Sequence, residues 1–296
     1  MPRVSALPAP VLVIGAVVSV QFGGALAATL VPIIGASGSV TLRLIIAAVV
    51  MLLIARPSVR DRSRGDWAVV VGFAITLGLM NLCFYSALAR LPIGVTVTLE
   101  FLGPLTLATV LSRRLLDLVS VAAAALGVVL ISGALTTPWG DLDLTGLGLA
   151  LAAGACWAAY IIFSGRTGQR FAQLDGLAIA MFISAVLVAP LGFIEAGTGL
   201  WSWDALSRGL GIAVLSSVLP YSLELMALRR LAAGVFGILL SLEPAVAALA
   251  GLVVLGQRLG GVELAGMALV VGASALVMGR QQHQPRAAEL AETTNQ

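Results

Sequence analysis

Two glutamates lie deep inside apolar stretches of the sequence, where an ionisable side chain is costly. Glu100 stands about eight residues into the apolar run 93–111, and Glu243 about eleven residues into the run 232–255. At about 1.5 Å per helical residue, both approach the midplane of a hydrocarbon layer about 30 Å thick. A charge there costs about 2.5–3.5 kcal/mol, so it needs a partner, water or a function. The pair predicts a site that binds a substrate or carries a proton, because desolvation disfavours the ionised carboxylate. A structural ion pair or a polar clamp between helices is the alternative.

Further polar side chains fall within the apolar runs. Arg43 lies a few residues inside the outer end of the run 39–55, so it either reaches the interface or a carboxylate, or binds substrate. Glu224 lies about one turn from Arg229, which favours a local ion pair at the inner interface. The remaining hydrogen-bonding groups serve either as ligands or as helix–helix contacts; they belong to Gln21, Asn81, Tyr85, Trp157, Tyr160 and Tyr221.

Three prolines, Pro104, Pro220 and Pro244, fall inside apolar runs. Each removes a backbone donor and frees a carbonyl four residues earlier. We therefore expect these helices to bend, or to offer backbone groups to a solute, at these points.

Several kinds of chemistry lack the residues that they need. The sequence has no lysine, and its one histidine, His283, lies in the polar C-terminal tail. This excludes a Walker phosphate loop, Schiff-base chemistry and histidine acid–base catalysis. Cys83 and Cys156 lie within apolar runs, where we expect them to pack as small side chains. The sequence therefore predicts no enzyme, no cofactor and no metal site.

The composition is that of a membrane protein. Hydrophobic residues make up 59% of the 296 residues and charged residues only 10%, against about 25% charged in a soluble domain. The net charge of +3 does not indicate nucleic-acid binding, because the arginines lie in loops between apolar runs. The pattern predicts an all-α polytopic protein with ten transmembrane helices, near 11–31, 39–55, 67–89, 93–111, 117–135, 144–163, 176–194, 208–227, 232–255 and 262–279.

The arginines also set the orientation of these helices. With a cytoplasmic N-terminus, thirteen arginines fall inside and three, Arg90, Arg208 and Arg258, fall outside. This positive-inside bias places both termini in the cytoplasm. The first apolar run is long and leads into a second span, so we expect it to be retained rather than cleaved as a signal peptide.

The chain repeats itself at an offset of 140 residues. Residues 87–108 align with 227–248 without a gap, and ten of 22 positions are identical. They include the pairs Arg90/Arg230 and Pro104/Pro244. An odd number of helices per repeat inverts the second half, a plan that recurs in secondary transporters. We predict one five-helix repeat in 1–138, an inverted one in 139–280 and a polar cytoplasmic tail in 281–296; a duplicated channel or scaffold is the alternative.

Longer passages resemble a known family over nearly the full chain. They are TLRLIIAA around Arg43, MNLCFYSALARLPIGVTVTLEFLGPL from Met80, SRRLLD from Ser112, GACWAAYI from Gly154, LPYSLELMALRRL from Leu219 and FGILLSLEPAVAALAG from Phe236. The chain resembles the EamA-type transporters of the drug/metabolite transporter superfamily, and within them the bacterial inner-membrane threonine/homoserine exporters. Family members often carry Gly-Glu after the ninth helix, where this chain has Gly256-Gln257, so a role of that glutamate is not carried over.

The resemblance implies alternating access, with efflux coupled to the proton-motive force across the bacterial inner membrane. Our hypothesis is an exporter of small neutral amino acids, with threonine and homoserine as leading substrates and protons as coupled partner, acting as a monomer or homodimer. Glu100 and Glu243 would receive the ammonium group, and Arg43 or a tyrosine the carboxylate. The alternatives are another cargo on the same fold (an aromatic amino acid, a purine or a drug-like cation), a membrane-embedded enzyme and a passive channel.

Overall fold

Helix is the only regular structure in the part of the chain that the computed structural model describes. That part comprises residues 7–60, 62–91, 93–111, 115–131, 135, 138, 143–243, 245–246 and 260–281. A helix satisfies its backbone hydrogen bonds within one segment, which a long apolar stretch in lipid requires. The all-helical class predicted from the apolar runs is confirmed for these residues.

Described helix lies within every apolar run that the sequence predicts. The helices are α1 (Ala9–Ala28), α2 (Val31–Ala55), α3 (Arg64–Leu88), α4 (Ile93–Leu111), α5 (Leu115–Ile131), α6 (Leu144–Arg170), α7 (Asp175–Ala196), α8 (Trp203–Ala213), α9 (Leu219–Leu228), α10 (Ala233–Leu240) and α12 (Gly261–Gln281), with a 3-10 turn, η4 (Gly197–Trp201), and a π-helical turn, η5 (Val214–Val218). Within the described residues, five segments are long and apolar enough to cross a membrane: Val31–Ala55, Arg64–Leu88, Leu144–Arg170, Asp175–Trp201 and Trp203–Leu228.

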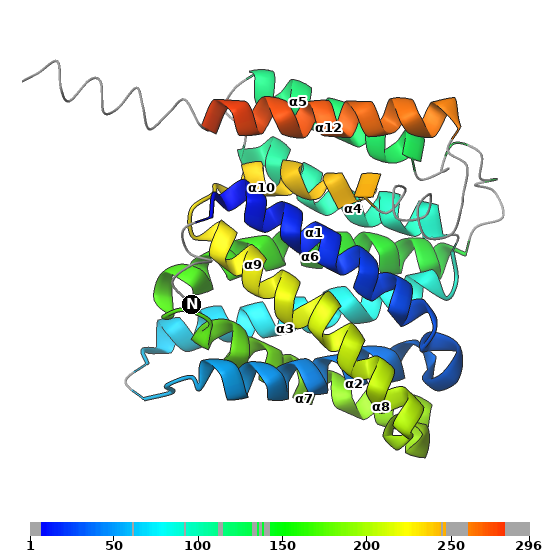
Figure 1. Ribbon diagram of the computed structural model, residues 1–296, viewed down its shortest axis with the longest axis vertical. Coiled ribbons are helices and arrows are strands. Elements are labelled where there is room, and N and C mark those ends of the chain that lie inside the picture. The colour runs from blue at the N-terminus through cyan, green and yellow to red at the C-terminus, as the bar shows by residue number, and fades with distance from the viewer. Residues whose placement is uncertain are drawn as a thin grey trace, which may run out of the picture.

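The helices lie side by side in stacked pairs (Figure 1). The pair of α5 and α12 forms one edge of the molecule, and α4 packs on α10 beneath it. The opposite edge holds α2 and α7, which pack on each other. Between these edges, α3 packs on α6, while α1 packs on α8, η5 and α9.

Glycines bring the backbones of paired helices together. A Cβ built on Gly127 of α5 would lie 2.7 Å from the Gly266 carbonyl oxygen, and one on Gly266 of α12 would lie 2.8 Å from that of Gly127. A Cβ on Gly103 of α4 would overlap the carbonyl group of Gly154 on α6. Small residues at such crossings let helices associate by close packing, which matters in lipid because apolar side chains gain little by leaving it.

Two helical segments depart from regular α geometry. Gly35 interrupts α2 with φ of +76°, and the Glu195 carboxylate accepts the N–H groups of Ser37 (2.6 Å) and Gly38 (3.2 Å) directly after the break. The π-helical turn η5 precedes Pro220 in the continuous span from α8 to α9. The break in α2 leaves these two N–H groups without a carbonyl acceptor in the helix, and the Glu195 carboxylate accepts them instead.

The predicted helix-bending prolines have different surroundings. Pro104 lies buried inside α4, and Pro220 directly follows the π-helical turn. Pro244 lies outside the described residues. The sequence analysis did not predict the interruption at Gly35, nor did it single out Pro190 inside α7.

Charged side chains join helix ends at both faces of the bundle. At the face on which α3 begins and α6 ends, Arg170 of α6 pairs with Asp66 of α3 at 3.3 Å. At the opposite face, Arg90 pairs with Asp143 at 3.1 Å, and Asp143 also caps α6 by accepting the Thr145 N–H. The Arg90 hydrogen bond, with that backbone N–H, holds the pKa of Asp143 below its ordinary value. These contacts fix the ends of α3 and α6 relative to their neighbours.

Two glycines of α12 provide a matched test of this packing. Gly266→Ala places a Cβ within 3 Å of the Gly127 carbonyl oxygen, Leu130 and Ile131, whereas a Cβ at Gly272 meets open space. We expect Gly266→Ala to lower stability by about 1–3 kcal/mol through overpacking, and Gly272→Ala to leave it unchanged. Thermal unfolding of the purified variants in detergent measures both. Equal unfolding temperatures would contradict the close approach of α5 and α12.

Candidate functional site

A buried arginine lies at the centre of the molecule with few partners. Arg43 of α2 is only 5% exposed. Its guanidinium group donates to Oδ1 of Asn81 on α3 and lies over the ring of Tyr85, 5.4 Å from the centroid. Among the described residues, its Nε has no hydrogen-bond partner, and no carboxylate lies within ion-pair distance. A buried cation without a counter-charge is costly, so this site is poised for an anion.

Of the alternatives predicted for Arg43, the described residues show neither exposure at the interface nor a pair with a carboxylate, which leaves substrate binding as a prediction. α2 begins at Val31, eight residues before the predicted start of this helix, so Arg43 lies deeper than expected. Asn81 extends the contact: its Nδ2 donates to the Leu77 carbonyl at 2.7 Å and to the Tyr221 hydroxyl at 3.3 Å. Arg43, Asn81 and Tyr221 form what we name the donor cluster.

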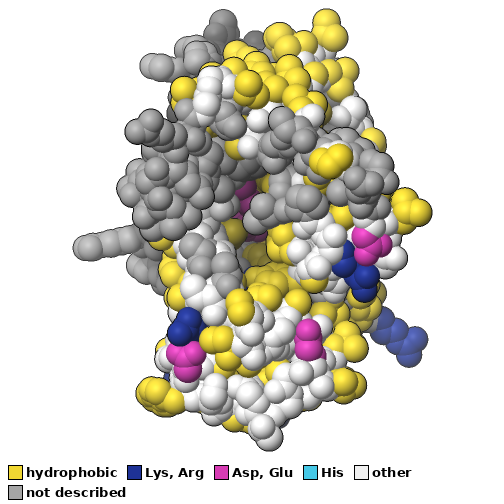
Figure 2. Space-filling view, turned by 90° about the vertical axis from the view of Figure 1, so that its right-hand side faces the viewer, with side chains coloured by type: hydrophobic (Ala, Val, Ile, Leu, Met, Phe, Trp, Pro, Cys, Tyr) yellow, Lys and Arg dark blue, Asp and Glu magenta, His cyan; other side chains and the backbone are white. Residues whose placement is uncertain are grey.

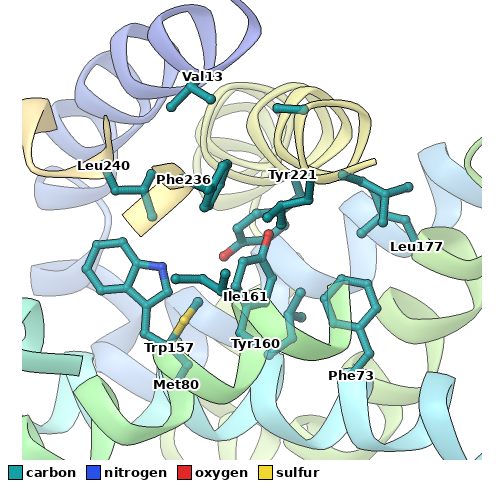
Figure 3. Close-up of a cluster of buried hydrophobic side chains, with 14 of the residues drawn as sticks. Val13, Phe73, Met80, Trp157, Tyr160, Ile161, Leu177, Tyr221, Phe236 and Leu240 are labelled. Atoms are coloured by element: carbon teal, nitrogen blue, oxygen red, sulfur yellow. The ribbon is translucent and has the colours of Figure 1, made fainter. Parts of the chain in front are cut away.

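Next to the donor cluster lies a buried carboxylate. The Tyr160 hydroxyl donates to Oε2 of Glu224 at 2.7 Å, and the rings of Tyr160 and Tyr221 lie 5.6 Å apart. Figure 3 shows Tyr160 and Tyr221 side by side within a cluster of buried apolar side chains. The Tyr160–Glu224 bond therefore joins α6 to α9 beside the donor cluster.

The predicted pair between Glu224 and Arg229 is wrong. Arg229 instead donates to the carbonyls of Gly168 (2.8 Å), Phe171 (2.9 Å) and Gln173, where it caps the C-terminal end of α6. Glu224 is 4% exposed and faces inward, because it shares a helix face with Tyr221 three residues earlier. That spacing was the signal in the sequence that could have placed Glu224 in the site.

Three carboxylates come from elements that pack together: Glu100 from α4, Glu224 from α9 and Glu243 from the segment just beyond α10, which contacts both α4 and α9. We name these three residues the acidic cluster. Glu100 and Glu243 are half-buried, and no described arginine lies within ion-pair distance of any of the three. Carboxylates grouped without a cation repel one another, which makes the cluster a favourable place for a cation or a proton.

A hollow leads toward the interior from one face of the molecule. Figure 2 shows this face, with acidic side chains visible inside the hollow and apolar ones around it. It is the face on which α3 ends and α6 begins, so it is the predicted outer face. A polar solute entering from this side would meet carboxylates within an apolar setting.

The close crossing of α4 and α6 positions Glu100. A Cβ on Gly154 would lie 2.7 Å from the Glu100 carbonyl oxygen, so the two backbones are in contact there. One turn further along α6, Trp157 packs edge-on against Phe101, with ring centroids 4.9 Å apart. Pro104, one turn beyond Glu100, lies against Gly237 of α10, whose Cβ would lie 2.9 Å from the Pro104 carbonyl oxygen.

The structure thus brings together most of the predicted site residues. Arg43, Asn81, Tyr85 and Tyr221 are in contact, and Tyr160 adjoins them. Gln21 is half-buried on α1 without a described contact to these residues, whereas Ser19 on the same helix donates to the Leu215 carbonyl in η5. Among the described residues, no group of three His, Cys, Asp or Glu is placed to hold a metal ion, and both cysteines are free thiols.

Comparisons with known proteins agree with a membrane transporter. The sequence profile described as "EamA-like transporter family" matches residues 144–279. Threonine/homoserine exporter RhtA of Salmonella typhimurium (strain LT2) is 40% identical over 271 residues, and that of Escherichia coli K12 is 38% identical over 272; each alignment covers 90% of both chains. Protein PecM of Dickeya dadantii is 25% identical over 221 residues, 71% of this chain and 73% of its own.

The fold also matches a solved structure. A crystal structure superposes with a TM-score of 0.76 and covers 93% of this chain and 98% of its own, at 19% sequence identity. That similarity shows the fold alone.

A double-mutant cycle tests the Arg43–Asn81 contact. Asn81→Leu removes the acceptor of a buried cation, and Arg43→Met leaves the Asn81 oxygen without a donor. We expect each change to lower stability by about 1–3 kcal/mol. The double variant should recover much of the loss, because both polar partners are then apolar. Thermal unfolding in detergent measures the four proteins, and additive losses would contradict the contact.

Proposed function

The chain belongs to the EamA-like transporter family, and from this we propose that it exports small neutral amino acids, with threonine and homoserine as the leading substrates. It is a multi-pass membrane protein and a transporter rather than an enzyme, as are its family members. The two relatives with 38–40% identity are named threonine/homoserine exporters, which supports this cargo. Their bacterial origin supports a place in the inner membrane.

The arrangement of charges carries the proposal. A free amino acid bears an ammonium group and a carboxylate close together, and both must be paired in a cavity with little water. The donor cluster presents a guanidinium group that no described carboxylate neutralises, and the acidic cluster presents carboxylates without a described cation. Arg43 and Tyr221 would bind the substrate carboxylate, and Glu100 and Glu243 the ammonium group. The donor cluster would supply the positive charge for the substrate carboxylate, and the acidic cluster would supply the negative charge for its ammonium group.

The other predicted site residues would shape this cavity. Tyr85 and Trp157 present aromatic surface, Asn81 presents hydrogen-bonding groups, and Gln21 would line the cavity from α1, whereas the hydroxyl of Tyr160 is engaged by Glu224. The side chain of a small substrate would lie against these groups.

We further propose ten transmembrane helices in two inverted repeats, residues 1–138 and 139–280, followed by a polar tail, 281–296. Helix packing supports this division. An offset of five helices relates α1 to α6, α2 to α7, and α3 to the continuous span from α8 to α9. The packing of α3 on α6 then corresponds to the packing of α8, η5 and α9 on α1. In the other three pairs, each helix packs on its own equivalent in the second half: α2 on α7, α4 on α10 and α5 on α12. A two-fold axis between the halves would produce this pattern.

Transport would proceed by alternating access, with protons moving in the opposite direction. Pro104 and Pro220, together with Pro244 outside the described residues, are candidates for the points at which helices bend. Exchange of an ammonium group for a proton within the acidic cluster would couple the two flows, because each reduces the negative charge that attracts the other.

An aromatic amino acid is the second candidate substrate. Trp157, Tyr160 and Tyr221 lie close together near the polar groups, and such rings favour contact with another aromatic ring (Figure 3). Competition for transport would distinguish the two cargoes.

Transport by the purified protein tests the cargo. In proteoliposomes loaded with unlabelled threonine, labelled threonine and homoserine should exchange saturably, and should accumulate against a gradient only while protons can flow. Threonine amide and N-acetylthreonine should compete poorly, because each lacks one of the two charges. If a folded protein moves neither amino acid, the cargo assignment fails while family membership stands.

Replacement of Glu100 tests the acidic cluster. Glu100→Gln keeps the size of the side chain and removes its charge, so we expect it to abolish binding and proton-driven export in a protein that still folds. Elution as a single species in gel filtration controls for folding. Undiminished proton-driven export would remove Glu100 from the mechanism.

A further inference from the structure

Glu224 differs from the other two members of the acidic cluster in its surroundings. It is 4% exposed, whereas Glu100 and Glu243 are half-buried. Its one described hydrogen bond comes from the Tyr160 hydroxyl at 2.7 Å. Glu224 is therefore the most enclosed of the three carboxyl groups, and its hydrogen bond ties it to α6.

No described side chain forms an ion pair with Glu224. From α6 comes Tyr160, which donates a hydrogen bond to it, and from α9 itself comes Tyr221. Arg229 on the same helix is engaged by backbone carbonyls, and the guanidinium group of Arg43 on α2 donates to Asn81. The described residues of α1, η5 and α10 include no ionisable side chain, and those of α7 carry only Asp175 and Glu195, at its two ends. Among the described residues, Glu224 therefore has a hydrogen-bond donor but no ion-pair partner.

We propose that Glu224 carries the coupled proton, while Glu100 and Glu243 bind the substrate; this rests on the export function proposed above. When the substrate's ammonium group enters the acidic cluster, its positive charge favours the ionised form of Glu224. The proton then leaves a carboxyl oxygen of Glu224 for water, and the resulting carboxylate keeps the hydrogen bond from Tyr160. Loss of the substrate removes that positive charge, and a proton returns from water.

With this division of roles, binding of the substrate weakens binding of the proton, and binding of the proton weakens binding of the substrate. By linkage, a substrate that expels a proton must bind more tightly as the pH rises. Tyr160 acts as a positioning residue, because its hydroxyl stabilises the ionised carboxylate without touching the substrate. Removal of that hydroxyl should therefore move proton release to higher pH.

Proton release on substrate binding tests the proposal. Detergent-purified protein is mixed with threonine in weak buffer containing a pH indicator, and threonine binding is measured in parallel by calorimetry. The wild type should release protons on binding. Glu224→Gln should still bind threonine and exchange it in proteoliposomes, but release no protons and lose accumulation driven by a pH gradient. Tyr160→Phe should bind threonine and release its protons at higher pH.

Two controls separate this proposal from the export function. Asp204→Asn removes an exposed carboxylate at the outer end of α8 and should behave as the wild type. Glu100→Gln should lose binding and release together. Proton release that persists in Glu224→Gln, or an unshifted pH profile in Tyr160→Phe, would overturn the role of Glu224 while leaving the cargo assignment intact. A folded wild type that binds no amino acid would overturn the export function and this proposal with it.

Discussion

Inside a bilayer, every polar group must find its partner within the protein, because the hydrocarbon offers no hydrogen bonds. Helical backbones meet this requirement by themselves, but the guanidinium group of Arg43 does not. Its contacts with Asn81 and the Tyr85 ring satisfy only part of its hydrogen-bonding capacity, and Nε finds no partner in the part of the chain that the structure describes. The chain retains a group that lipid and apolar packing both disfavour. Much of the interior is arranged around that group, from the Asn81–Tyr221 bond to the tyrosines beside it.

Close helix packing sets where these polar groups meet. Glycine contacts bring α4 against α6 and α5 against α12, so the backbones touch without intervening side chains. Because Gly154 lies against the Glu100 carbonyl, the position of that glutamate follows from the crossing of two helices rather than from its own contacts. The same argument applies to Arg43, whose depth is fixed by where α2 begins.

The sequence was sufficient to predict the helices and much of the site, but not how the helices face one another. Apolar length located the helical segments, and the rarity of polar groups within them singled out Arg43, Asn81 and Tyr221. The mistake at Glu224 came from judging it by its neighbour Arg229 along the chain. Its actual partner, Tyr160, is 64 residues away and becomes a neighbour only through the packing of α6 on α9. The interruption at Gly35 was missed for the same reason, since the Glu195 carboxylate that completes it comes from α7.

The contact between Glu195 and the interrupted start of α2 bears on how such a protein can change shape. It ties the last turn of α7 to α2, and these two helices belong to different halves in the proposed division. Two halves that are joined along one edge can still rotate relative to each other about that edge, which then acts as a hinge. The largest displacements would then occur far from that edge, toward α4 and α10 (Figure 1). Glu100 and Glu243 come from that region, so a small rotation would change the distance between them more than it changes the surroundings of Arg43.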